Sequence, residues 1–214
     1  MSYKVSGPCP DDWSLAQKLI LRGCEPLPRR RCFAKTVPKT RSKNDFLIDD
    51  VLAMGIGGIR IGFDIGSGSG TFAARMSEKN VTVLTNTLHT DAPYAEFIAA
   101  RGLLPLFLSF DHRFPFYDNV FDLVHATTGL DVGGKPEKLE FLMFDIDRIL
   151  RAGGLFWLDN IYCANDEKKR TLTRLIERFR YKKMKWVIGE KIDAGGSGKP
   201  ELYLSAVLQK PVRV

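Results

Sequence analysis

From residue 59 onward, short apolar runs alternate with amphipathic stretches. The apolar runs predict buried strands at 59–65, 81–87, 104–110, 121–127 and 155–162. Between them, apolar residues recur every three or four positions, which predicts helices at 71–79, 92–101 and 136–151. Strands that alternate with helices predict a parallel sheet covered by helices on both faces.

The end of the chain breaks this alternation. A helix at about 166–179 follows the fifth strand, and two further strands at 183–190 and 201–209 are joined by the glycine-rich segment 193–198. No helix fits between these two strands, so they should pair antiparallel as a hairpin. The prediction is therefore an α/β fold with a sheet of seven strands.

Residues 1–45 have a different character, because five prolines interrupt them. We predict one helix from Asp11 or Asp12 to about Leu21, ended by Gly23, and then a run of basic residues over 29–43. A short helix from Phe46 to Met54 leads to the first strand. The predicted organisation is an N-terminal cap with a basic arm (1–45) and one main domain (46–214).

Composition narrows the classes of protein. The chain has 214 residues, 44% of them hydrophobic, and a net charge of +7, which suits anionic partners. No apolar run approaches the roughly 20 residues that span a bilayer and the start of the chain is polar, so we expect a soluble protein. The four cysteines form no C-x-x-C pair, so we expect no metal site. Cys24 and Cys32 form either a disulfide or two free thiols.

The segment Asp64–Gly70 is the strongest chemical signal, because it joins a predicted strand to a predicted helix. It reads D-I-G-S-G-S-G, and glycines at every second position let the backbone turn sharply and approach a ligand. The dinucleotide fingerprint is G-x-G-x-x-G instead, with its acid about 20 residues later. An acid followed by G-x-G-x-G is typical of S-adenosyl-L-methionine (SAM) sites. The alternative is a glycine-rich turn of some other α/β protein.

Two further motifs lie in order behind this turn. Phe114–His125 (FPFYDNVFDLVH) leads into the fourth predicted strand, and Ile149–Phe156 (ILRAGGLF) leads into the fifth. Together the three motifs resemble the class I SAM-dependent methyltransferases, over residues 46–211. The resemblance implies a Rossmann-like sheet with six parallel strands and one antiparallel strand, to which the helix predicted within residues 1–45 adds a short N-terminal helical cap. It also implies SAM as cofactor and S-adenosyl-L-homocysteine as product.

Within that class, the chain is most similar to plant, Golgi-type methyltransferases related to pectin methylation. The segments that carry this likeness are Pro8–Pro10 with Trp13, Asn44–Asp49, Asp111–Phe116, Lys185–Val187 and Gln209–Pro211. Such proteins are usually longer and carry an N-terminal membrane anchor. The resemblance therefore implies the Golgi if the full-length protein has that anchor, and the cytoplasm otherwise.

The resemblance assigns the cofactor site residue by residue. SAM would lie over Gly66, Ser67, Gly68 and Gly70, with Asp64 ordering the turn or meeting the methionine ammonium group. The family's usual acid after the second strand, which accepts both ribose hydroxyls, is replaced here by Asn86, followed by Thr87. Asp91 caps the next helix or reaches the ribose. Asp111 matches the position that accepts the adenine amino group, and the neighbouring His112 either packs on that ring or lies in water.

Methyl transfer depends mostly on placement, and a base is needed only when the acceptor must lose a proton. The candidates at strand ends are Asp159, which we rank first, followed by His125, Asp131 and Tyr162. His125 is either a base or a satisfied buried histidine. The basic run 29–43 is either a solvated arm, a clamp for an anionic acceptor or a lid over SAM.

The predicted reaction is methyl transfer from SAM to an oxygen or carboxylate, with a cell-wall polysaccharide as candidate acceptor. Two alternatives stay open: a small-molecule O- or N-methyltransferase, and a binding protein without turnover, which the missing acid at Asn86 keeps in view. A nucleic-acid acceptor is not expected, because no N/D-P-P-Y tetrapeptide occurs in the chain.

Overall fold

The computed structural model describes residues 43–212, except 69, 88–94, 96–97, 100–101, 128–129, 131–134, 164–165 and 193–199. The predicted cap helix, almost all of the basic run, Cys24, Cys32, Asp91 and Asp131 lie outside the described residues. Most of the helix predicted at 92–101 lies outside them too.

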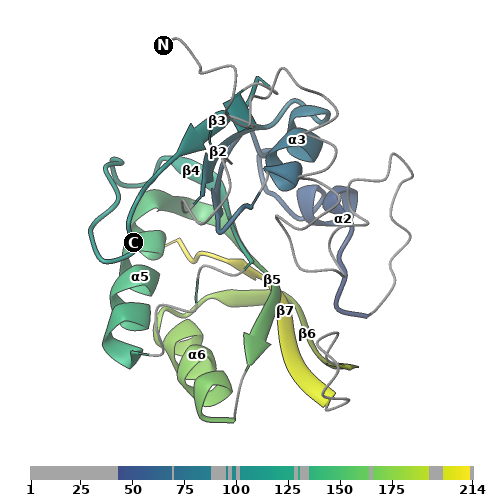
Figure 1. Cartoon of the computed structure of the whole chain (residues 1–214), viewed down its shortest axis with the longest axis vertical. Helices are drawn as coiled ribbons and strands as arrows, with labels where there is room; N and C mark the ends of the chain where they lie inside the picture. The colour runs from purple at the N-terminus through teal and green to yellow at the C-terminus, as the bar shows by residue number, and fades with distance from the viewer. Residues whose placement is uncertain are drawn as a thin grey trace, which may run out of the picture.

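The described residues form one sheet of seven strands in the order β3-β2-β1-β4-β5-β7-β6 (Figure 1). The strands are β1 (Ile61–Ile65), β2 (Thr82–Asn86), β3 (Leu104–Leu106), β4 (Phe121–Ala126), β5 (Leu150–Cys163), β6 (Lys182–Ile192) and β7 (Pro200–Gln209). β7 pairs antiparallel with both β5 and β6, and the other pairs are parallel. Six strands are therefore parallel and one is antiparallel, as predicted.

Helices cover both faces of this sheet (Figure 1). α5 (Pro136–Ile149) and α6 (Asp166–Arg178) pack on one face, and α2 (Ile48–Leu52) and α3 (Thr71–Ser77) pack on the other. Among the described residues, no helix has the length and apolarity that crossing a membrane requires.

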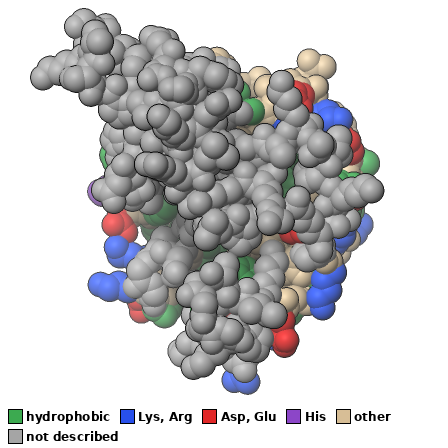
Figure 2. Space-filling view, turned by 45° about the vertical axis from the view of Figure 1, so that its right-hand side comes forward, with side chains coloured by type: hydrophobic (Ala, Val, Ile, Leu, Met, Phe, Trp, Pro, Cys, Tyr) green, Lys and Arg blue, Asp and Glu red, His purple; other side chains and the backbone are tan. Residues whose placement is uncertain are grey.

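The described surface carries mixed charge. In Figure 2, Lys and Arg side chains stand out at the rim of the view with Asp and Glu side chains near them. Some of these charges form exposed ion pairs, such as Lys79 with Asp49 at 2.7 Å and Arg75 with Glu78 at 3.0 Å. Exposed pairs contribute about 1 kcal/mol at most, so the fold depends on its core.

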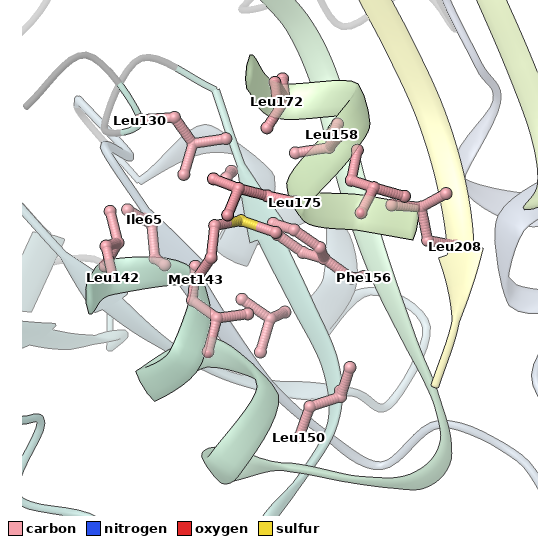
Figure 3. Packing of buried hydrophobic residues seen from close by; sticks show 14 of the residues in the cluster. Ile65, Leu130, Leu142, Met143, Leu150, Phe156, Leu158, Leu172, Leu175 and Leu208 are labelled. Atoms are coloured by element: carbon pink, nitrogen blue, oxygen red, sulfur yellow. The ribbon is translucent and has the colours of Figure 1, made fainter. Parts of the chain in front are cut away.

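Each face of the sheet has its own core, because successive side chains on a strand point to opposite faces. The larger core lies under α5 and α6, where Met143 and Leu175 pack near Phe156 of β5 (Figure 3). The smaller core lies under α2 and α3, where Met76 and Trp157 belong to the same cluster. In β1, Phe63 joins the larger core, and the next residue, Asp64, is buried on the other face.

Most strand ends lie within two residues of prediction, and two strands, β3 and β5, differ by more. β3 has three residues instead of seven, because the backbone of Leu108 pairs with the side chain of Asn86 instead of extending the strand. β5 begins at Leu150, five residues early, because pairing continues through the Gly153–Gly154 bend. There the Gly153 N–H donates to the Lys210 carbonyl, and the Lys210 N–H donates to the Gly154 carbonyl.

Candidate active site

The glycine turn after β1 requires its glycines for backbone geometry. Gly66, Gly68 and Gly70 have φ angles of 74°, 55° and 74°, which L side chains rarely adopt. A Cβ on Gly70 would also lie only 2.9 Å from Cγ1 of the buried Ile98. The predicted turn is therefore built as the sequence motif requires.

Hydroxyl groups fix this turn from both neighbouring strands. On the β2 side, Ser67 Oγ donates to the Asn86 carbonyl at 3.1 Å, and Thr87 Oγ1 donates to the Gly68 carbonyl at 3.3 Å. On the β4 side, Thr127 Oγ1 donates to the Gly66 carbonyl at 2.8 Å. Ser67 and Thr87 thus anchor the turn. Sequence reasoning missed Thr127, and its only signal is its position directly after a predicted strand.

Three candidate residues from β1, β4 and β5 meet near the carboxyl ends of β1 and β4. Asp64 is fully buried, and its Oδ1 lies 2.7 Å from Nδ1 of His125. Nε2 of His125 lies 3.6 Å from Oδ2 of Asp159. The His125 ring stacks on Phe72 of α3 with a centroid distance of 3.8 Å and meets Trp157 edge-on. The structure therefore brings Asp64, His125 and Asp159 together.

The electrostatics of this cluster favour a charged imidazole. Burial opposes the imidazolium form of His125, but the nearby carboxylates of Asp64 and Asp159 outweigh it and raise the pKa of His125 to about 9. At neutral pH both ring nitrogens then carry protons: Nδ1 can donate to Asp64, whereas Nε2 faces Asp159 as an ion pair beyond hydrogen-bond distance. Such a histidine is a poor proton acceptor, which favours the satisfied buried role over the role of base.

Asp159 sits at an irregularity in β5. The pairing of β5 with β7 shifts between Leu158 and Ile161, and Asn160 has a φ of 53°. Asn160 donates its backbone N–H to Ser205 Oγ and its side-chain amide to Asp159 Oδ1 at 2.8 Å. Bulges of this kind re-aim side chains beside active sites. The Asp159 side chain is held in this way and is still 28% exposed.

The other predicted residues lie outside this three-residue cluster. Tyr162 lies farther along β5, partly exposed and close to the ring of Tyr203. Asp111 and His112 are exposed on the segment that follows β3. The hydrogen bond from Lys138 of α5 to Asp111, at 2.5 Å, lowers the pKa of that carboxyl group.

Asn86 is fully buried and uses its side-chain amide on Leu108. Its Oδ1 accepts from the Leu108 N–H at 2.8 Å, and its Nδ2 donates to the Leu108 carbonyl at 3.1 Å. Sequence reasoning placed Asn86 at the ribose and missed this structural use. The signal was present, because an amide both donates and accepts, as a strand backbone does.

Comparison with known proteins identifies the family of this chain. The family described as "Putative S-adenosyl-L-methionine-dependent methyltransferase" matches residues 43–199. The chain belongs to this family of SAM-dependent methyltransferases. It is accordingly a SAM-dependent enzyme of the class that the three sequence motifs resembled.

The relatives and the solved structures agree with this assignment. The Arabidopsis thaliana "Probable methyltransferase At1g29790" is 35% identical, over 99% of this chain and 68% of its own length. "Probable methyltransferase PMT1" from the same plant is 28% identical, over 69% of this chain and 23% of its own length. A SAM-dependent methyltransferase structure from Methanosarcina mazei matches 79% of this chain and 99% of its own, with a TM-score of 0.62 and 16% identity. That likeness shows the fold.

The residues at the turn fit the cofactor. The second oxygen of Asp64, Oδ2, is buried and has no hydrogen-bond partner among the described residues, so an acceptor is left for a donor such as an ammonium group. Among the described residues at the end of β2, Asn86 and Thr87, there is no carboxylate, and the amide of Asn86 is already bonded to Leu108. The fit is thus carried by the glycine turn and Asp64.

Proposed function

We propose that this methyltransferase acts on an oxygen of its acceptor, and that the preferred acceptor group is a hydroxyl. The observation that carries the proposal is the partly exposed carboxylate of Asp159, which directly follows the last pair of β5 with the carboxyl end of β4, where open α/β sheets bind ligands. A carboxylate can accept the proton that a hydroxyl loses, whereas it would repel an anionic carboxylate acceptor.

The roles of the residues follow from their contacts. SAM supplies a methyl group on a positively charged sulfur. Asp64 and the turn Gly66–Gly70 would hold the cofactor, and Phe72 and Trp157 exclude water from the buried side of His125. Oδ2 of Asp159 would accept the acceptor's proton. Fixing these groups in advance supplies much of the rate, since placement dominates this reaction.

We propose a cell-wall polysaccharide as the acceptor class. The net charge of +7 and the likeness to plant methyltransferases support it. The proposal implies the Golgi as the compartment of the reaction. One observation keeps a binding protein without turnover as a second candidate. The last residue of β2 is Asn86 rather than an acid, and its side-chain amide is bonded to the backbone of Leu108.

Labelled SAM tests the acceptor directly. The protein is incubated with methyl-labelled SAM and three acceptor sets: an acidic polysaccharide, the same polymer with its carboxyl groups reduced to alcohols, and small plant metabolites. Methyl esters are released by mild alkali as methanol, whereas methyl ethers are stable. We expect alkali-stable label on the polymer before and after reduction, and loss of that label in Asp159→Asn.

Other outcomes assign other functions. Alkali-labile label that disappears on reduction would identify a carboxylate acceptor, and label in the metabolites alone would identify a small-molecule enzyme. SAM binding measured by calorimetry, with no S-adenosyl-L-homocysteine formed in any set, would support the binding protein. An alkali-labile label, or the absence of turnover, contradicts the hydroxyl proposal, whereas label in the metabolites alone contradicts the polysaccharide proposal.

A further inference from the structure

A row of four polar side chains crosses the face of the sheet under α3. Thr85, Asp64, His125 and Trp157 are neighbours in register on β2, β1, β4 and β5, so their side chains point to the same face. All four are buried, with exposed fractions of 3% or less. Each has one polar atom without a hydrogen-bond partner among the described residues: Thr85 Oγ1, Asp64 Oδ2, His125 Nε2 and Trp157 Nε1.

Carboxylates lie near both ring nitrogens of His125. Asp64 faces one ring nitrogen at 2.7 Å, and Asp159 faces the other at 3.6 Å. Asn160 also connects Asp159 with Asp45, a third carboxylate from the segment before α2, at 3.3 Å. From α3, the ring of Phe72 stacks on the imidazole. A buried carboxylate is costly unless a positive charge compensates it, and Asp64 is fully buried, so the ring of His125 beside it is where a positive charge is most favourable.

We propose that His125 is a positioning residue whose imidazolium links Asp64, at the cofactor turn, to Asp159, on the acceptor side. The cation attracts both carboxylates and so fixes their positions relative to each other. The cofactor turn at Asp64 and the acceptor side at Asp159 are therefore positioned by the same residue. The raised pKa of His125 agrees with this role. The role of Asp159 rests on the proposed function, whereas the contact with Asp64 stands without it.

Two isosteric variants separate the two contacts. The amide nitrogen of His125→Asn takes the place of Nδ1, so it keeps the donor to Asp64 and loses the reach to Asp159. The amide nitrogen of His125→Gln takes the place of Nε2 and does the reverse. We expect His125→Asn to keep SAM affinity within about threefold of the parent and to lose tenfold or more in kcat. We expect His125→Gln to lose about tenfold in SAM affinity.

A matched control tests for simple disturbance of the row. Thr85→Val keeps the shape of a buried neighbour of Asp64 and changes no charge. It should leave both SAM affinity and kcat close to the parent values. Equal losses of affinity and kcat in the two His125 variants, or losses no larger than those of Thr85→Val, would overturn the proposal.

Titration of the parent chain by NMR reads the charge without any acceptor. We expect the His125 imidazole to be protonated at pH 7.5 and to titrate well above 8. An imidazole that titrates near 6.5 would refute the proposal even if neither variant folds. Because calorimetry and NMR need no acceptor, failure of the hydroxyl proposal is distinguishable from failure of this one.

Discussion

Arg148 should be among the most sensitive positions in the chain. Its guanidinium donates to the Phe114 carbonyl at 2.9 Å and the Phe116 carbonyl at 2.6 Å, and to Asp145 at 2.7 Å. Asp145 is 5% exposed and accepts the Phe114 N–H at 2.6 Å. One side chain of α5 thus fixes the whole turn that precedes β4.

The expected cost of Arg148→Met follows from burial. Removing one partner of a buried ion pair costs about 3–5 kcal/mol, and since the Arg148 side chain is 16% exposed we expect about 3 kcal/mol. The exposed pair of Arg148 with Asp118 adds little to this loss of about 3 kcal/mol, because solvent screens it. A loss of that size is a large fraction of the roughly 5–15 kcal/mol that stabilises a domain.

Urea unfolding measures this loss. With a slope of about 1–3 kcal/mol per molar urea, the midpoint should fall by about 1 M or more at unchanged slope. Arg113→Met is the matched control, because Arg113 also pairs with Asp118, at 3.3 Å, but its side chain is 65% exposed. It should leave the midpoint nearly unchanged. If Arg148→Met behaves like Arg113→Met, the stabilising role of Arg148 is wrong.

Three further predictions concern the site itself. A folded pKa of about 9 for His125, against 6.5 unfolded, means that the contribution of His125 to stability is full below pH 6.5 and falls by about 3 kcal/mol as pH rises to 9. Urea midpoints across this range should show the fall in the parent and not in His125→Asn. Gly70→Ala should lose about 1–2 kcal/mol from its left-handed backbone alone, and more from the contact with Ile98, as thermal unfolding would reveal. Asn86→Asp sets a carboxylate against the Leu108 carbonyl, so it should cost about 1–3 kcal/mol without tightening SAM binding; tighter binding by calorimetry would contradict this.

The sheet was predictable because burial leaves a periodic trace in the sequence. Fully buried parallel strands such as β1 appear as short apolar runs, and α5 repeats its apolar residues every three or four positions. The glycine turn was predictable for a related reason: left-handed backbone at Gly66, Gly68 and Gly70 strongly favours one residue type. In each case a requirement of the local structure, burial or a left-handed backbone, restricts which residue types can stand there.

The contacts between strands were not predictable in the same way. His125 is 61 residues from Asp64 and 34 from Asp159, so their meeting depends on the register of three strands. A histidine inside an apolar run indicates that a polar partner is needed, but the local sequence does not show which residue that partner is. Sequence reasoning therefore left base and buried histidine open, and only the two carboxylates at its ring nitrogens separate them.

The amide at the end of β2 and the segment after β3 are explained together. Asn86 holds Leu108, Lys138 holds Asp111, and Arg148 holds Phe114 and Phe116, so side chains from β2 and α5 fix this segment along its length. An acid at position 86 would have no N–H for the Leu108 carbonyl, and the first of these anchors would be lost. The residue that departs from the family's usual pattern at the ribose therefore serves the segment that presents Asp111 and His112.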